Sequence, residues 1–187
     1  MIETYDCLCG GFIWEWCDHA IYKGTAENGK EIYYYGGDHG EYPNDGNFCM
    51  DGMVYPDRTP HTGLLEYKNV HRPVRVVSYN QTEGIVLLKN EMNYLSLQEY
   101  VDVTYEVTCD GALVESGQLD LTDVPAIRPH QIGNVQLPVN VPEKGRVYLK
   151  LTYQLKHADA FRSQGYELGF DEILLENVDG SNRRVTD

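Results

Sequence analysis

The fold is decided by two stretches of alternating sequence, VDVTYEVT at residues 101–108 and VYLKLTYQLK at residues 147–156. In both stretches apolar residues alternate with polar ones, so that one face of an extended chain is apolar and the other is polar. Asp110-Gly111 follows the first stretch and supplies a tight turn, because both residue types tolerate positive φ. The alternation therefore predicts half-buried antiparallel strands.

Further strands are predicted on either side of these two. Short runs bounded by Gly and Pro turns mark them, at residues 74–78, 85–88, 113–117, 132–139 and 166–175. About seven short strands in roughly 110 residues match an immunoglobulin-like antiparallel β-sandwich. We assign this mainly β domain to residues 72–187, where no amphipathic helix pattern competes with the strands.

The first 71 residues differ in composition from the rest: they contain both tryptophans and many Gly and Pro residues typical of turns. The run GGFIWEW at 10–16 has a short apolar core after two glycines and predicts a buried strand. A turn-rich stretch from Gly24 to Pro60 follows, which is too long for an ordinary connection. Its tyrosines and histidines argue against disorder. We predict one strand and a functional loop, joined directly to the sandwich near His71 to Arg75.

Composition excludes several classes of function. The chain has 187 residues, of which 42% are hydrophobic and 24% charged, and its 29 acids against 15 bases give a net charge of −14. These values are typical of a soluble globular protein. The negative charge opposes binding to phosphate backbones or anionic lipid, and no apolar stretch is long enough to span a membrane. We expect neither nucleic acid nor membrane as a partner.

Cysteine usage favours reduced thiols. An odd number clustered toward the start does not suit a disulfide framework, and the spacing completes no zinc motif. We expect buried structural thiols at Cys7, Cys9, Cys17, Cys49 and Cys109.

Local pairs of reactive residues give weak signals. Glu15 and Asp18 are candidate paired carboxylates, and Cys17 with His19 is a candidate nucleophile and base, but sequence neighbours do not fix such geometry. Solvated or helix-capping roles are therefore favoured for Glu15 and Asp18, and a structural thiol is favoured for Cys17. The run NDGN at 44–47 lacks the closing glutamate of a calcium loop and predicts a turn. Surface or core hydrogen bonding is expected for His39 and His61.

A family resemblance adds to this picture. It is carried by GGFIWEW at 10–16, YGGDHGEYPNDGNFCMDGMVYPDRTPH at 35–61 and LLEYKNVHRPVRV at 64–76. Together these segments closely resemble the end of the catalytic barrel of family 2 glycoside hydrolases, specifically β-galactosidases. In that family an immunoglobulin-like sandwich follows the barrel directly. A complete (β/α)8 barrel takes about 250 residues, so residues 1–71 are expected to hold only the last strand and long loop of an incomplete TIM barrel.

The resemblance implies an activity that this chain does not complete. The family is a retaining hydrolase in which one glutamate protonates the leaving oxygen and a second attacks the anomeric carbon. Both glutamates lie upstream of GGFIWEW in the family. The resemblance therefore implies a fragment that lacks the catalytic pair and is inactive alone, taken from a parent that hydrolyses terminal non-reducing β-D-galactosides.

Three residues inherit roles from the resemblance. Trp14 matches the indole that forms a wall of the galactose subsite, where an aromatic face meets the C–H face of the sugar. Phe48 matches the residue whose backbone carbonyl helps to hold a sodium ion. Asp51 stands where well-known members have an asparagine that also binds sodium; a carboxylate keeps a hard oxygen but adds negative charge. Loop-ordering roles are assigned to Asp38, Asp45 and Arg58.

The resemblance also implies properties of the parent enzyme: magnesium and sodium as cofactors, a galactoside as substrate, the remainder of the same polypeptide as partner, and a homo-oligomeric state. The sequence does not determine the compartment of the protein, and the cytoplasm is favoured. Two alternatives stay open. One is a non-catalytic sandwich module that binds carbohydrate or protein, with Tyr148 on the polar side of its strand as a candidate. The other is a parent that cleaves a related glycoside such as a β-glucuronide, against which the NDGNFCMDG run argues.

Overall fold

Both alternating stretches are strands in the structure, a computed structural model that describes residues 4–5 and 7–176. The chain divides into two compact units, residues 1–67 and 68–187, between Tyr67 and Lys68. The division falls inside helix α1 (Thr62–Val70). The predicted domain ranges, 1–71 and 72–187, include residues 1–3, 6 and 177–187, which lie outside the described residues.

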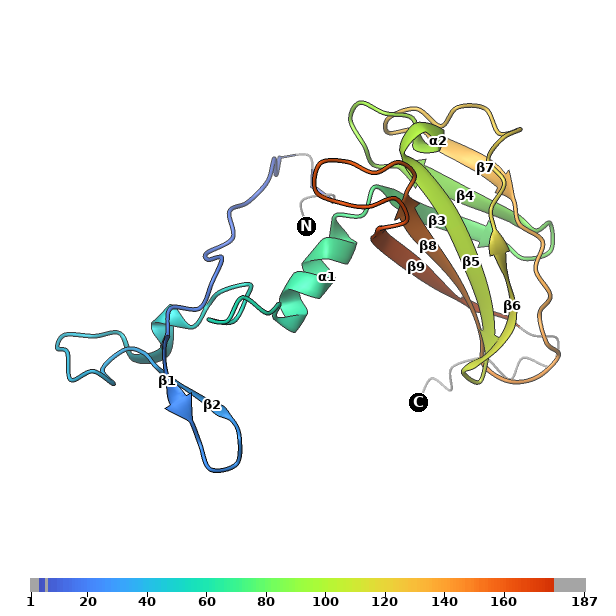
Figure 1. Cartoon of the computed structure of the whole chain (residues 1–187). Helices are drawn as coiled ribbons and strands as arrows, with labels where there is room; N and C mark the ends of the chain where they lie inside the picture. The colour runs from blue at the N-terminus through green and yellow to red at the C-terminus, as the bar shows by residue number, and fades with distance from the viewer. Residues whose placement is uncertain (1–3, 6, 177–187) are drawn as a thin grey trace. The chain divides into compact units, whose positions relative to one another are not determined.

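The second unit contains two antiparallel sheets (Figure 1). The three-stranded sheet has the order β3-β4-β7, with β3 at Val74–Asn80, β4 at Ile85–Asn90 and β7 at Ile132–Gln136. The four-stranded sheet has the order β6-β5-β8-β9, with β5 at Val101–Cys109, β6 at Ala112–Gln118, β8 at Val147–Leu155 and β9 at Glu167–Leu175. This arrangement is an immunoglobulin-like sandwich. The predicted fold class is confirmed.

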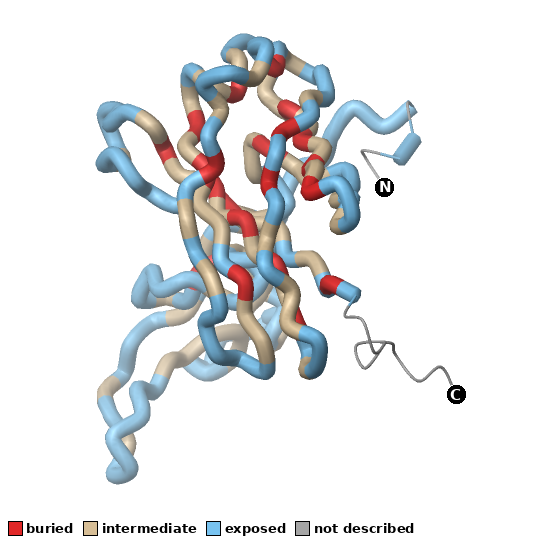
Figure 2. The backbone as a smooth tube through the Cα atoms, turned by 90° about the vertical axis from the view of Figure 1, so that its right-hand side faces the viewer, coloured by how far each residue is buried: buried red, intermediate tan, exposed pale blue. Residues whose placement is uncertain are grey.

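Alternation along the strands builds the core between the sheets. In β8 every odd-numbered residue from Val147 to Leu155 is buried and every residue between them is half-buried. Paired residues such as Val107 and Leu149 therefore point the same way, into the core. Burying each such side chain contributes about 1.5–3 kcal/mol. Figure 2 shows the buried positions concentrated on the sandwich strands.

The strand ends differ slightly from prediction, for local reasons. β7 stops at Gln136 instead of residue 139, because Pro138 has no N–H to continue the ladder. A single helical turn, α2 (Leu97–Tyr100), precedes β5, where the Glu99 carboxylate accepts a hydrogen bond from the Ser96 N–H in a capping box.

The first unit contains few regular elements. A hairpin is formed by β1 (Ile21–Thr25) and β2 (Glu31–Tyr34), and a 3-10 turn, η1, covers Gly46–Cys49. The prediction of a buried strand at residues 10–16 is wrong: this segment is irregular, and Phe12 and Trp14 are exposed. A barrel strand needs a neighbour along each edge, and among the described residues the backbone of segment 10–16 is hydrogen-bonded to residues 51–54 alone.

Helix α1 was not anticipated from the sequence. Its apolar residues form no clear stripe, and none of its residues is buried. The helix ends before Pro73, because the residue preceding a proline disfavours helical backbone.

Candidate active-site loop

The residues that carry the family resemblance meet along one line of contact in the first unit. The segment 14–19 lies against the loop 46–54. Backbone hydrogen bonds of 2.9–3.2 Å join them: Glu15 N–H to Asp51 O, Val54 N–H to Trp16 O, Asp18 N–H to Val54 O, and His19 N–H to Cys49 O. A β-bridge between Cys17 and Val54 belongs to the same contact.

Gly52 lets the two segments approach this closely. A Cβ built on Gly52 would lie 2.2 Å from Asp18 N and 2.4 Å from Cys17 C, both backbone atoms that cannot yield. Only glycine fits at this position of the NDGNFCMDG run. The sequence motif thus encodes the packing of the loop.

Asp51 has an unusual carboxylate. The residue is half-buried, and its Oδ1 is buried without a hydrogen-bond partner among the described residues. A buried polar oxygen with no partner carries a free-energy cost of about 1–3 kcal/mol. A hard cation would remove that cost by accepting the oxygen as a ligand, so Asp51 fits the sodium role that the resemblance implies.

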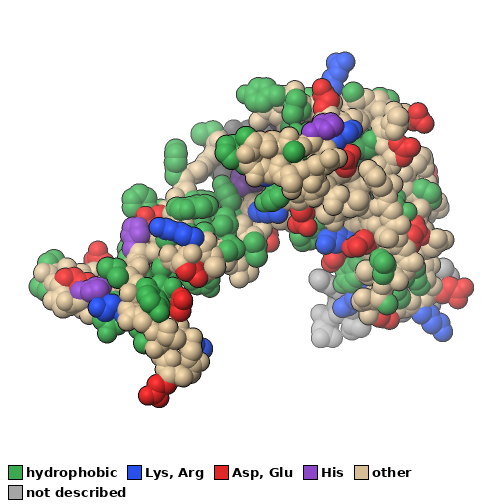
Figure 3. All heavy atoms as spheres, viewed as in Figure 1, with side chains coloured by type: hydrophobic (Ala, Val, Ile, Leu, Met, Phe, Trp, Pro, Cys, Tyr) green, Lys and Arg blue, Asp and Glu red, His purple; other side chains and the backbone are tan. Residues whose placement is uncertain are grey.

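Trp14 and Phe48 flank this contact with exposed rings. The Trp14 indole is 80% exposed and precedes Glu15, whose N–H bonds to Asp51. Phe48 is 77% exposed and precedes Cys49, whose carbonyl accepts from His19. Figure 3 shows hydrophobic side chains gathered on the surface of this unit. The structure therefore brings all three predicted site residues to one contact between two segments.

A hydrogen-bonded pair of side chains, Asp18 and His61, holds the same contact and was not anticipated from the sequence. Asp18 is only 3% exposed; its Oδ1 accepts the Gly52 N–H at 2.8 Å, and its Oδ2 lies 2.8 Å from His61 Nε2. The His61 ring stacks on Tyr55, with 3.7 Å between ring centroids. Asp18 and His61 are 43 residues apart, so no spacing in the sequence indicates that they meet. Hydrogen bonding by His61 was expected, and the contact confirms it.

The weaker candidate pairs have other partners. Glu15 Oε1 lies 3.1 Å from His19 Nε2, whereas Asp18 binds His61. The Cys17 thiol hydrogen-bonds to the carbonyls of Asp18 and Tyr55. The expected solvated or helix-capping role is wrong for Asp18, which is buried and accepts the Gly52 N–H outside any helix, because the loop 46–54 covers it.

The rest of the loop is ordered by short-range hydrogen bonds. The Glu41 carboxylate accepts the Gly37 N–H at 2.6 Å and the His39 N–H at 3.0 Å, and the bond from Gly37 holds the pKa of Glu41 below its usual value. Asn44 Oδ1 accepts the Gly46 N–H at 3.1 Å, as in the predicted turn. Asp38 orders the loop in the same way by accepting the Tyr35 N–H at 2.9 Å.

The cysteine prediction needs a correction. Cys7 and Cys9 are exposed, and the other three are half-buried, so none is a fully buried thiol. The first two precede the loop contact, in a segment whose residues 7–14 are all exposed. Within the described residues, no group of three His, Cys, Asp or Glu side chains is placed to hold a metal.

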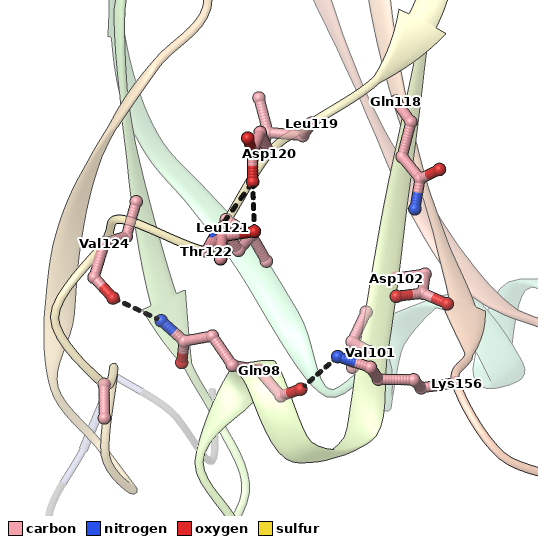
Figure 4. Close-up of a pocket in the computed structure, with 11 residues that line it drawn as sticks. Gln98, Val101, Asp102, Gln118, Leu119, Asp120, Leu121, Thr122, Val124 and Lys156 are labelled. Atoms are coloured by element: carbon pink, nitrogen blue, oxygen red, sulfur yellow. Dashed lines mark hydrogen bonds between the residues drawn. The ribbon is translucent and has the colours of Figure 1, made fainter.

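The sandwich carries a separate hollow of about 660 Å³ (Figure 4). Asp102 and Gln118 face it beside Leu119, and Lys156 donates to the Gln98 carbonyl at 2.7 Å. The lining residues that the structure describes include no aromatic side chain. Tyr148, the candidate for a carbohydrate-binding face, is half-buried on its strand. Neither feature provides the exposed aromatic platform on which a sugar stacks.

A loop-rich first unit followed by a β-sandwich agrees with the class that the resemblance implies, the end of a glycoside hydrolase barrel followed by a sandwich domain. Residues 1–76 match the family model described as the TIM barrel domain of glycosyl hydrolases family 2. Residues 86–176 match the model described as domain 4 of β-galactosidase. The chain belongs to the family 2 glycoside hydrolases, and within them to the β-galactosidases, as the resemblance predicts.

Known relatives extend this similarity along the chain. The chain is 38% identical over 180 residues to a β-galactosidase of Staphylococcus xylosus, covering 94% of this chain and 17% of that protein. It is 40% identical over 169 residues to a β-galactosidase of Actinobacillus pleuropneumoniae, covering 89% of this chain and 15% of that protein. A β-galactosidase of Priestia megaterium is 32% identical over 181 residues. The chain thus spans 15 to 17% of the length of these relatives.

The helices add one observation about membranes. Among the described residues, no helix has both the length and the apolarity needed to cross a bilayer.

Proposed function

We propose that this chain is a portion of a retaining β-galactosidase, to which it contributes an active-site wall and a sodium-binding loop. In this proposal both catalytic glutamates lie elsewhere in the whole enzyme, which hydrolyses terminal non-reducing β-D-galactosides. The names of the relatives support the activity. Magnesium, a homo-oligomeric state and a cytoplasmic location are proposed for the whole enzyme by resemblance alone, with no residue of this chain assigned to them.

The buried and unpartnered Oδ1 of Asp51 is the observation that carries the proposal. An ionised carboxylate keeps such an oxygen out of water only if a cation or donor replaces the lost hydration. The Asp51 side chain and the Phe48 carbonyl would hold sodium, which supplies a hard positive charge for a sugar hydroxyl. Asp51 brings a full negative charge where an asparagine would bring a dipole, so we expect tighter sodium binding here.

Trp14 supplies the apolar part of the site. Its indole is exposed beside the loop that carries Asp51, so its face is accessible to the C–H face of a sugar. Stacking of this kind binds the substrate and excludes water from one side of it. The role needs no proton transfer from the indole, which suits a chain without the catalytic pair.

The first test is hydrolysis of a chromogenic β-galactoside by this chain, with and without an added piece that contains the N-terminal part of the barrel. We expect no activity from the chain alone and recovered activity on mixing. Trp14→Ala should raise KM of the mixture by about tenfold or more. Phe12→Ala, at an exposed aromatic residue of the same segment, is the matched control. Activity of the chain alone would contradict the proposal.

The sodium role is tested by titrating the mixture with sodium chloride at constant ionic strength. Asp51→Ala should raise the half-saturating sodium concentration by at least about tenfold. Asp51→Asn keeps a neutral oxygen ligand, so its half-saturating sodium concentration should lie between those of the wild type and Asp51→Ala. Asp45→Asn, in the same loop, should leave sodium binding unchanged. An identical response of all variants would exclude Asp51 as a ligand.

The identity of the sugar is tested with a second substrate. A chromogenic β-glucuronide should not be hydrolysed by the mixture. Hydrolysis of the glucuronide in place of the galactoside would favour the related glycosidase over the one proposed here.

A further inference from the structure

We infer that the buried Asp18, together with its partner His61, positions the peptide between Asp51 and Gly52, and thereby the sodium ligand. The inference rests on the proposed function, because it concerns the same loop. In this inference Asp18 and His61 are positioning residues that touch neither sugar nor ion.

The peptide between Asp51 and Gly52 is held at both ends. Its carbonyl oxygen, on Asp51, accepts the Glu15 N–H at 3.2 Å. Its N–H, on Gly52, donates to Asp18 Oδ1 at 2.8 Å. A planar peptide held by its oxygen and its hydrogen cannot rotate. The direction in which the Asp51 side chain leaves the backbone is therefore set from segment 14–19.

Asp18 is itself held by His61, in a closed circuit. Asp18 Oδ2 lies 2.8 Å from the ring atom His61 Nε2, and the backbone N–H of His61 donates to the Met53 carbonyl at 3.0 Å. Met53 follows Gly52 directly, so the circuit runs from Asp18 to Gly52, Met53, His61 and back to Asp18. Stacking of His61 on Tyr55 fixes the imidazole plane. The orientation of the Gly52 N–H is thereby linked to the position of His61.

Burial argues for positioning rather than chemistry. Asp18 is 3% exposed and both of its oxygens are engaged, so neither oxygen is available to a sugar. Loss of Asp18 would leave the Gly52 N–H without its acceptor and the 51–52 peptide free to rotate. We expect weaker sodium binding from this disorder, while the catalytic groups elsewhere in the enzyme are unchanged.

The first experiment measures amide exchange of Gly52 by NMR in the full chain bound to the barrel-containing piece, because the first unit is expected to hold its shape weakly alone. In the wild type this amide should exchange at least about tenfold more slowly than that of Gly11, which lies in the exposed, irregular segment 10–14. Asp18→Ala should abolish the difference. Asp18→Asn keeps an acceptor oxygen for Gly52 and should retain most of it. Asp38→Ala removes an exposed carboxylate with a similar backbone bond and should have no effect.

The second experiment measures activity of the mixture with the barrel-containing piece as sodium is varied. Asp18→Ala should raise the half-saturating sodium concentration by about tenfold, with kcat at saturating sodium within about twofold of the wild type. His61→Gln retains a donor for Asp18 and should restore most of the affinity that His61→Ala loses. A merely structural role would lower the amount of active enzyme at every sodium concentration alike.

The outcomes separate the two proposals. Sodium-independent activity of the wild type would overturn the sodium loop, and Gly52 exchange would then still decide whether Asp18 holds the peptide. Unchanged Gly52 exchange and unchanged sodium affinity in Asp18→Ala would overturn the positioning role and leave the sodium loop standing. If Asp18→Ala does not fold, the comparison of His61→Gln with His61→Ala decides in its place.

Discussion

Asp171 shows at the residue scale how one carboxylate fastens the sandwich. Its Oδ2 accepts the Tyr153 hydroxyl at 2.6 Å and the Val76 N–H at 3.0 Å, while its Oδ1 lies 2.6 Å from the Arg72 guanidinium. These bonds join β9 to β8, to β3 and to the residues that precede β3. Burial raises the pKa of the Tyr153 hydroxyl, and the nearby Asp171 charge adds to the effect.

Tyr153→Phe tests this network. Losing a hydrogen bond to a charged group should lower the free energy of unfolding by about 1.5–3 kcal/mol at neutral pH. The pKa of Tyr153 is higher in the folded than in the unfolded chain, so its contribution is complete below about pH 10 and is lost as pH rises further. The difference between wild type and variant should therefore shrink above pH 10.

Urea unfolding at pH 8 and pH 11 measures both effects. Tyr94→Phe is the control. Tyr94 is 93% exposed, so its substitution should leave the free energy of unfolding unchanged at both pH values. A difference between wild type and Tyr153→Phe that does not depend on pH would contradict the expected linkage.

At the scale of elements, the β5–β6 hairpin depends on its turn. Asp110 has φ of 49° and Gly111 has φ of 83°, so both residues adopt the left-handed conformation that two-residue hairpins require. The Asp110 carboxylate also accepts the Arg146 N–H at 2.9 Å, which ties the turn to the start of β8. The Asp-Gly pair was recognised from the sequence, because its conformational preference is local.

Gly111→Ala should therefore destabilise the sandwich by about 1 kcal/mol, because a Cβ is strained at positive φ. Gly111→Asn is the matched variant and should cost less, since asparagine tolerates this conformation. Thermal unfolding of the two variants gives the comparison. Equal losses in both would show that the strain at residue 111 is unimportant.

On the scale of the whole molecule, the two units differ in how much apolar surface they bury. The core cluster lies entirely between Val74 and Leu175, and Val54 is the buried hydrophobic residue described in the first unit. Barrel strands normally pair on both edges, and residues 10–16 do not. We therefore expect the first unit to hold its shape weakly without the other barrel strands.

Hydrogen exchange followed by mass spectrometry tests that expectation. Peptides from β5 and β8 should exchange at least about 100-fold more slowly than peptides from residues 1–67. Similar protection in both units would show that the first unit is stable without further barrel strands.

Truncation locates the start of the stable unit. Asn69 Oδ1 accepts the Phe170 N–H at 2.8 Å, and Arg72 pairs with Asp171, so residues 68–72 belong with the sandwich. A chain of residues 68–187 should unfold at the same urea concentration as the full chain. A chain of residues 73–187 should be less stable by about 3 kcal/mol, because the Asp171 charge loses its partner. Equal stability of both truncated chains would contradict this role for the Arg72 pair.

The sequence by itself determined the sandwich and the family to which the loop segment belongs. Strand alternation at 101–108 and 147–156 is a local property, and the NDGNFCMDG run carries its own packing requirement in Gly52. The prediction of a strand at residues 10–16 failed because it depended on pairing with other strands. The run is apolar enough for a strand, but a strand forms only where neighbouring strands share its hydrogen bonds.

Only the tertiary structure decided how the loop is held. Asp18 and His61 are remote in sequence, and each is unremarkable in its own surroundings. Their pairing arises because Gly52 allows the loop to lie against segment 14–19, which buries Asp18 and leaves His61 and the Gly52 N–H to satisfy its carboxylate. Burial and long-range hydrogen bonding depend on which segments meet in space, and no periodicity along the chain encodes that.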